Sequence, residues 1–255
     1  MAKLAELIRR ATTVSPPPMG FAATAAKLQP TMLLLAVAGE RWKSAAADAV
    51  AAGADSVLLT SRPSDHDMAE AIAAAGGRPC GLLSPEGTFD QLARLHAGGI
   101  DFAILEPEAP ASVLLDEEMT LLLRLRQELT DVQLRTLDAM PVSALYIERE
   151  AGAVTIWRQM EMQRVNGLAR KPLALRAQPD AQQQDLLALR EAGVALLTVD
   201  MKERDAVASL QHLRSVIDAL PARRRPRREE RPTVTIPGAR GEPAGEDDDE
   251  DEDED

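Results

Sequence analysis

Charged residues recur where we expect apolar strands to end, and their order along the chain is suited to acid–base chemistry. Read outward along alternate positions of each expected strand, the closing polar residues are Glu40, Arg62, Ser84, Glu106, Arg124, Glu148, Arg176 and Asp200. If the first and last strands meet, Glu40 and Asp200 become neighbours. Two carboxylates that share a water-poor site push one pKa upward, so a general acid and a general base can coexist near neutral pH. Glu40 and Asp200 are therefore the candidate catalytic pair.

The same series predicts contacts to a small anionic or polar ligand. Arg62 and Arg176 would flank the two carboxylates as anion anchors, because a guanidinium pairs well with carboxylate or phosphate. The candidate ligand-contacting residues are Arg62, Glu106, Arg124, Glu148 and Arg176. A network of surface ion pairs is the other interpretation, since alternating Arg and Glu perturb one another without catalysing anything. Charged residues make up 27% of the chain, so charges at strand ends are expected from composition, which favours the network.

Signals for particular cofactors and metals are missing. The segments after the last two expected strands read AQPDAQ and DMKERD, without the glycines that cradle a phosphate. The motifs GxGxxG and GxxxxGK[ST] do not occur. Lys202 is the only lysine near a strand end that could form a Schiff base, and then only by turning inward. One cysteine and three histidines without ligand spacing predict no metal site, and the sequence identifies no cofactor.

The elements that position these residues form a regular series. Apolar runs of strand length open near residues 32, 56, 79, 101, 121, 143, 173 and 195, and most of the gaps have a helical pattern. Three units, 52-AGADSVLLTS-61, 98-GGIDFAILEP-107 and 192-AGVALLTVDM-201, place a helix-ending glycine just before a strand. The gap between residues 107 and 120 is the exception. It predicts a loop or short hairpin in place of a fourth helix.

Strands that alternate with helices at this period, and that are apolar on both faces, are typical of a parallel sheet. The pattern resembles the TIM (β/α)8 barrel over about residues 31–220, and the AG-x-D-strand units carry this resemblance of fold. It implies chemistry at the C-terminal mouth of the barrel. An open, doubly wound α/β sheet is the alternative. We expect a helix and a Pro-rich lead-in over residues 1–30, the barrel over 31–220, and a tail over 221–255.

Smaller candidates have structural explanations. Cys80, near the start of its strand, is expected at the bottom of the barrel as a buried apolar filler. Trp157, Met160 and Met162 have the spacing of core residues on a helix. His66 is placed at the mouth, where a solvated residue at a helix start is favoured over a general base.

Composition restricts the function classes. The net charge is −12, of which residues 221–255, with seven Arg and thirteen Asp or Glu, contribute −6. The rest is mildly acidic, so no nucleic-acid partner is expected. The apolar run 32-MLLLAVA-38 is too short to span a membrane and the N-terminal residues lack a signal-peptide pattern, which predicts a cytoplasmic protein.

The tail predicts disorder, because basic residues between Arg223 and Arg231 precede ten consecutive acidic residues. It would either attract an oppositely charged protein partner or act only as a solubilising segment. For the barrel, the favoured hypothesis is a small-molecule-binding or scaffold module without a catalytic motif. The alternative is a small-molecule enzyme, a lyase, isomerase or oxidoreductase, that uses the mouth carboxylates for proton transfer.

Overall fold

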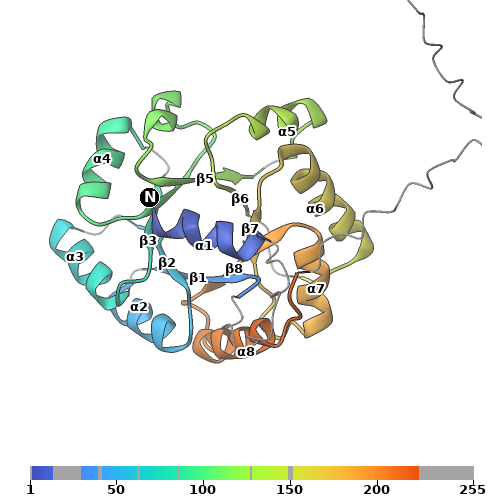
Figure 1. Cartoon of the computed structure of the whole chain (residues 1–255). Coiled ribbons are helices and arrows are strands. Elements are labelled where there is room, and N and C mark those ends of the chain that lie inside the picture. The colour runs from blue at the N-terminus through green and yellow to red at the C-terminus, as the bar shows by residue number, and fades with distance from the viewer. Residues whose placement is uncertain are drawn as a thin grey trace, which may run out of the picture. The chain divides into compact units, whose positions relative to one another are not determined.

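A closed barrel of eight parallel strands forms the centre of the structure (Figure 1). The computed structural model describes residues 2–13, 30–39, 42–61, 64–84, 87–126, 128–148 and 152–223, without the side chains of Asp65 and Ser84. The strands pair in chain order and are β1 (Leu33–Ala38), β2 (Ser56–Leu59), β3 (Cys80–Ser84), β4 (Phe102–Leu105), β5 (Thr120–Leu125), β6 (Ala144–Ile147), β7 (Leu173–Arg176) and β8 (Val194–Asp200).

Helices α2 to α8 surround the barrel in chain order, and α1 lies across it, as Figure 1 shows. They are α1 (Lys3–Thr12), α2 (Trp42–Ala51), α3 (Asp65–Ala74), α4 (Phe89–Ala97), α5 (Asp131–Asp138), α6 (Ile156–Ala169), α7 (Gln183–Glu191) and α8 (Ala206–Asp218). Between β4 and β5 the chain forms only the 3-10 helix η1 (Ala111–Leu115). The reduced element predicted after the fourth strand is therefore confirmed.

The first and last strands close the barrel. Strand β1 pairs in parallel with β8, and Val37 lies opposite Asp200 in this register. Closure confirms the prediction of a TIM barrel. The alternative prediction, an open and doubly wound sheet, is wrong.

Glycines end several helices, as predicted, but α6 departs from this pattern. Gly53, Gly99 and Gly193 each have a positive φ just before a strand. The sequence predicts that α6 stops at Asn166-Gly167, yet the helix continues to Ala169 and ends with Arg170 in the left-handed conformation, φ 50°. The left-handed position therefore falls three residues later than predicted, on a residue for which this conformation is less favourable than for glycine.

The core has two layers, one inside the barrel and one between the strands and the helices. Inside the barrel, Phe102 of β4 fills the space beside Gly81 of β3. A Cβ atom at position 81 would lie 2.2 Å from the Phe102 ring. Glycine on one strand thus makes room for an aromatic ring on the next.

Helix α1 covers the N-terminal end of the barrel. The backbone N–H groups of Lys3 and Leu4 donate to the two carboxylate oxygens of Asp101 at 2.6 and 2.8 Å, and Ala5 N–H donates to Thr120 Oγ1 at 3.3 Å. These acceptors satisfy N–H groups that have no partner within the helix. Leu4 and Ile8 pack into the barrel core, and burying a side chain of this size stabilises the fold by about 1.5–3 kcal/mol. A cavity opens at the opposite, C-terminal end of the barrel.

Two further features of the chain are its lack of a predicted membrane span and its charged tail. Within the described ranges, no helix is both long and apolar enough to cross a bilayer. The charged tail from residue 224 onward lies outside the described residues, so its predicted disorder remains a prediction.

Candidate functional site

A cavity of about 350 Å³ opens at the C-terminal ends of the strands. All strands except β4 contribute side chains from the strand or the residues just after it: Val37, Leu58, Thr60, Leu83, Arg124, Tyr146, Glu148, Arg176, Thr198 and Asp200. Three of these are aliphatic and seven are polar or charged. We call this space the mouth cavity.

On one side of the mouth cavity, four charged residues form a closed ring of ion pairs. Arg124 donates to Glu106 at 2.6 Å and also to Glu148. Arg126 donates to Glu106 at 3.0 Å, and its Nε lies 3.5 Å from Glu148 Oε2. Two cations and two anions alternate in this ring, so it carries no net charge. We call it the four-residue ring.

Arg124 and Glu106 are the buried members of this ring. Glu106 is 5% exposed and the Arg124 side chain 10% exposed. Burial opposes the charged form of Arg124, but hydrogen bonds to Glu148 and Glu106 outweigh it and raise the Arg124 pKa. A buried ion pair becomes costly when one partner is removed. Arg124 is thus held as a structural cation beside the cavity.

Arg176 is the more accessible cation of the mouth cavity. Its guanidinium hydrogen bonds Glu203, in the loop between β8 and α8, and 39% of its side chain is exposed. The hydrogen bond to Glu203 is the main cause of its raised pKa. Next to it, Asp200 Oδ1 accepts a hydrogen bond from Lys202 N–H at 2.9 Å, which orients the carboxylate.

Tyr146 supplies a neutral hydrogen-bond donor. Burial raises the pKa of its phenol, against the opposing effects of a hydrogen bond with Thr198 and of nearby Arg124. A raised pKa keeps the phenol protonated near neutral pH, because an unperturbed tyrosine titrates only near pH 10. The mouth cavity therefore presents a phenol, hydroxyl groups, a carboxylate and an accessible guanidinium beside an apolar surface.

The structure brings four of the predicted residues together. Arg124, Glu148, Arg176 and Asp200 line the mouth cavity, while Glu106 lies buried beside it in the four-residue ring. Glu40 and Arg62 lie outside the described residues, as does the side chain of Ser84. The predicted pairing of Glu40 with Asp200 therefore remains a prediction.

Sequence analysis missed five polar or charged residues of this region, Thr60, Tyr146, Thr198, Arg126 and Glu203. Tyr146 precedes Glu148 by two positions and Thr198 precedes Asp200 by two, so each shares a face of its strand with a predicted residue. Extending the alternation inward by one step would have found both. Arg126 follows Arg124 by two positions, so one step outward would have found it, whereas Glu203 lies in the loop after β8, where the alternation no longer applies.

Three other candidates from the sequence, Lys202, Cys80 and His66, do not line the mouth cavity. Lys202 passes over Gly39, where a Cβ atom would lie 2.1 Å from its Cε. Cys80 is buried, as expected, and burial is the main cause of a thiol pKa of about 12. His66, 84% exposed and 3.9 Å from Glu70, matches the predicted solvated residue at a helix start. Among the described residues, no three potential ligands gather into a metal site.

The prediction for α6 is wrong in part. Met162 is buried, but Trp157 and Met160 are 76% and 56% exposed. Residues two positions apart on a helix point about 200° away from each other, so Met160 and Met162 cannot share a face. Helical spacing alone did not fix which of the two faces packs inward.

Comparison with known proteins identifies the fold and goes no further. No protein-family model and no curated protein sequence matches the chain. A thiamine phosphate pyrophosphorylase from Pyrococcus furiosus is similar in structure, with a TM-score of 0.54 at 10% identity over 74% of this chain and 96% of the other. A 3-hexulose-6-phosphate synthase has a TM-score of 0.57 at 13% identity over 72% and 99%. A phosphoribosyl anthranilate isomerase from Thermus thermophilus has a TM-score of 0.51 at 14% identity over 73% and 98%. At such identities these likenesses establish the TIM-barrel fold only.

Proposed function

We propose that this barrel is a binding protein for a small anionic or polar molecule, held in the mouth cavity. The observation that carries the proposal is the cavity itself, lined by Arg176, Asp200 and Tyr146 beside aliphatic side chains. A volume of about 350 Å³ falls within the range of small-molecule sites, roughly 300–1,000 Å³. Its position at the C-terminal mouth is where ligands bind in this fold.

The lining indicates how such a ligand would be oriented. An anionic group would pair with Arg176, whose described partner, Glu203, comes from a loop and can be displaced more easily than a strand residue. A hydroxyl or amino group would donate to Asp200, and Tyr146 would donate to a ligand oxygen. Val37, Leu58 and Leu83 would contact the carbon skeleton. A hydroxycarboxylate or a sugar phosphate has this combination of groups.

A thermal-shift screen of the full chain tests the proposal, because a ligand selective for the native state raises the melting temperature. The screen includes hydroxycarboxylates, sugar phosphates, flavins and nicotinamide nucleotides, and hits are titrated by calorimetry. We expect Arg176→Gln to weaken binding of an anionic hit by about tenfold or more. Arg94→Gln, an exposed arginine on α4, is the matched control and should leave affinity unchanged. A screen without hits, or equal affinities in both variants, would contradict the proposal.

An enzymatic role is the second candidate, and one observation favours it. Asp200 and Tyr146, a carboxylate and a protonated phenol, line the same cavity, so one could accept a proton while the other donates one. Glu40 remains the proposed second carboxylate. Proton NMR of each hit in deuterated water tests this role. Exchange or chemical change that needs the wild-type protein and disappears in Asp200→Asn would support an enzyme, whereas an unchanged ligand supports the binding module.

A further inference from the structure

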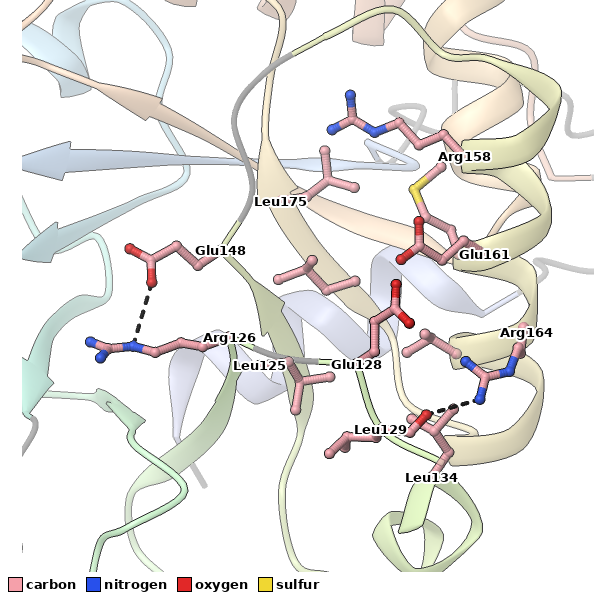
Figure 2. A pocket seen from close by; sticks show the side chains of 13 residues that line it. Leu125, Arg126, Glu128, Leu129, Leu134, Glu148, Arg158, Glu161, Arg164 and Leu175 are labelled. Carbon is pink, nitrogen blue, oxygen red and sulfur yellow. Dashed lines mark hydrogen bonds and ion pairs between the residues drawn. The ribbon is translucent and has the colours of Figure 1, made fainter. Parts of the chain in front are cut away.

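A second, smaller cavity lies on the outer side of the same strands (Figure 2). It has a volume of about 110 Å³ and lies between β5, β6, β7 and the helices α5 and α6. Leu125, Ile147 and Leu175 line it, one residue along each strand from inward-facing Arg124, Tyr146 and Arg176. Successive residues of a strand face opposite sides of the sheet, so the two cavities lie on opposite sides of the barrel wall. We call this space the outer pocket.

The inner surface of the outer pocket is apolar. Besides the three strand residues, Leu129, Leu134, Met162 and Val165 line it from the α5 region and α6. A cavity of about 150 Å³ with such a lining accommodates benzene. A volume of 110 Å³ therefore suits an alkyl group of about four or five carbon atoms.

The charged residues around the opening are three arginines and three glutamates. They are Arg126, Glu128, Glu148, Arg158, Glu161 and Arg164. Arg126 and Glu148 form an ion pair, and Arg164 pairs with Asp131 at 2.6 Å. Arg158 and Glu161 contribute one charge of each sign. Counted together with Asp131, which lies outside the lining, these residues carry three positive and four negative charges, and Glu128 is the carboxylate left over.

Glu128 has no hydrogen-bond or ion-pair partner among the described residues. Figure 2 shows its carboxylate extending from the loop before α5 toward α6, where the Glu161 carboxylate approaches the same part of the opening. The Glu128 carboxylate, at the edge of an apolar pocket, attracts a cation, and an alkyl group attached to that cation would fill the space below.

We propose that the outer pocket binds a small alkyl ammonium ion, with the alkyl group against Met162 and Val165 and the ammonium group beside Glu128. This site is separate from the mouth cavity and does not depend on the function proposed for it. Among the residues that the structure describes, Glu148 is the one that lines both spaces.

Methionine methyl NMR on the full chain tests the proposal. With 13C-methyl methionine, Met162 reports on the outer pocket, and Met160, exposed on another face of α6, is the internal control. Met162→Leu and Met160→Leu assign the two signals. The probes are 3-methylbutylamine, 3-methylbutanol and 3-methylbutanoate, which share an alkyl group and differ in head-group charge.

We expect 3-methylbutylamine to shift the Met162 signal with a dissociation constant of about 1 mM, in keeping with its few non-hydrogen atoms. The alcohol should bind several-fold more weakly, and the carboxylate more weakly still. Glu128→Gln should bring the affinities for the amine and the alcohol to within about twofold of each other. Glu117→Gln removes an exposed carboxylate before β5, at the other end of the barrel, and should leave the preference unchanged.

Several results would overturn the site. They are an unshifted Met162 signal with every probe, equal affinities for amine and alcohol in the wild type, or an equal effect of both glutamate variants. A hit at the mouth would be detected independently, through Arg176→Gln, so failure of one proposal is distinguishable from failure of the other.

Discussion

Arg124 and Glu106 form an ion pair of 2.6 Å that is almost completely shielded from water. Charges buried this deeply are expensive to leave unpaired, since the desolvation penalty stays when the attraction is removed. Glu106 Oε2 and Arg124 Nε have no hydrogen-bond partner among the described residues, so the pair already lacks part of its possible compensation. The Arg124–Glu106 ion pair therefore has a structural role beside the mouth cavity, and its two charges are not available to pair with a ligand.

Glu106→Gln should therefore destabilise the fold by about 3 kcal/mol, measured as the free energy of unfolding in urea. This lies at the low end for breaking a buried pair, because Glu148 still compensates Arg124. Glu117→Gln, the exposed control, should change stability by less than about 0.5 kcal/mol. Similar small effects for both variants would contradict a structural role for Glu106.

Tyr146 is the only tyrosine in the chain, so its ionisation can be followed directly by absorbance at 295 nm. We expect the folded protein to titrate at higher pH than the urea-unfolded chain, because burial raises the phenol pKa. The folded state then holds the proton longer than the unfolded state. The contribution of Tyr146 is therefore fully present below the unfolded pKa of about 10 and is lost as pH rises through the higher folded value. Coincident titration curves would contradict burial of the phenol.

Cys80 should behave as an indicator of global unfolding. It is the only cysteine, it is buried, and its raised pKa of about 12 leaves almost no thiolate at pH 8. We expect a pyridyl disulfide to react with it slowly in native protein and rapidly in urea. The native rate should increase in the destabilised Glu106→Gln variant. Fast reaction of the native wild type would instead indicate local opening near β3.

Glu203 should compete with an anionic ligand for Arg176, since the guanidinium hydrogen bonds this carboxylate at the edge of the mouth cavity. Glu203→Gln is therefore expected to strengthen binding of an anionic hit several-fold, whereas Arg176→Gln weakens it. Calorimetry on both variants measures the two effects. Weaker binding in Glu203→Gln would mean that the carboxylate positions Arg176 and does not compete with the ligand.

Glu148 should couple the two cavities, because its two carboxylate oxygens interact with different arginines, Arg124 and Arg126. We expect a saturating alkyl amine in the outer pocket to change the affinity of a mouth ligand, and Glu148→Gln to abolish that change. Linkage requires the reverse effect to be equal in size. Calorimetric titrations with and without the second ligand measure both directions, and additive binding in the wild type would exclude coupling.

The barrel could be predicted from sequence because several of its units repeat the same local sequence pattern. A glycine such as Gly53 or Gly193 ends a helix and a continuous apolar run follows, which only a parallel strand covered on both sides can use. Strand alternation also singles out Arg124, Arg176 and Asp200, and all three line the mouth cavity.

Features that depend on tertiary packing could not be predicted in this way. Which face of α6 packs inward depends on the elements around it, and the helical spacing alone does not reveal that face. The prediction that Trp157 is a core residue is therefore wrong, since its side chain is exposed. Glu203 reaches Arg176 from a loop whose path no sequence period describes. The outer pocket likewise arises from how α5 and α6 sit on the sheet, and its lining residues appear in sequence as ordinary core positions.

The position of α1 has a consequence for the order in which the molecule assembles. Its hydrogen-bond acceptors, Asp101 and Thr120, are 98 and 115 residues away from their donors Lys3 and Ala5 along the chain. The sequence separation between β1 and its partner β8 is larger still. At ~5–20 residues per second, a ribosome needs roughly 5–20 s to make the intervening hundred residues. During that time Leu4 and Ile8 have no binding site, so the helix made first is secured only after half of the barrel has been synthesised.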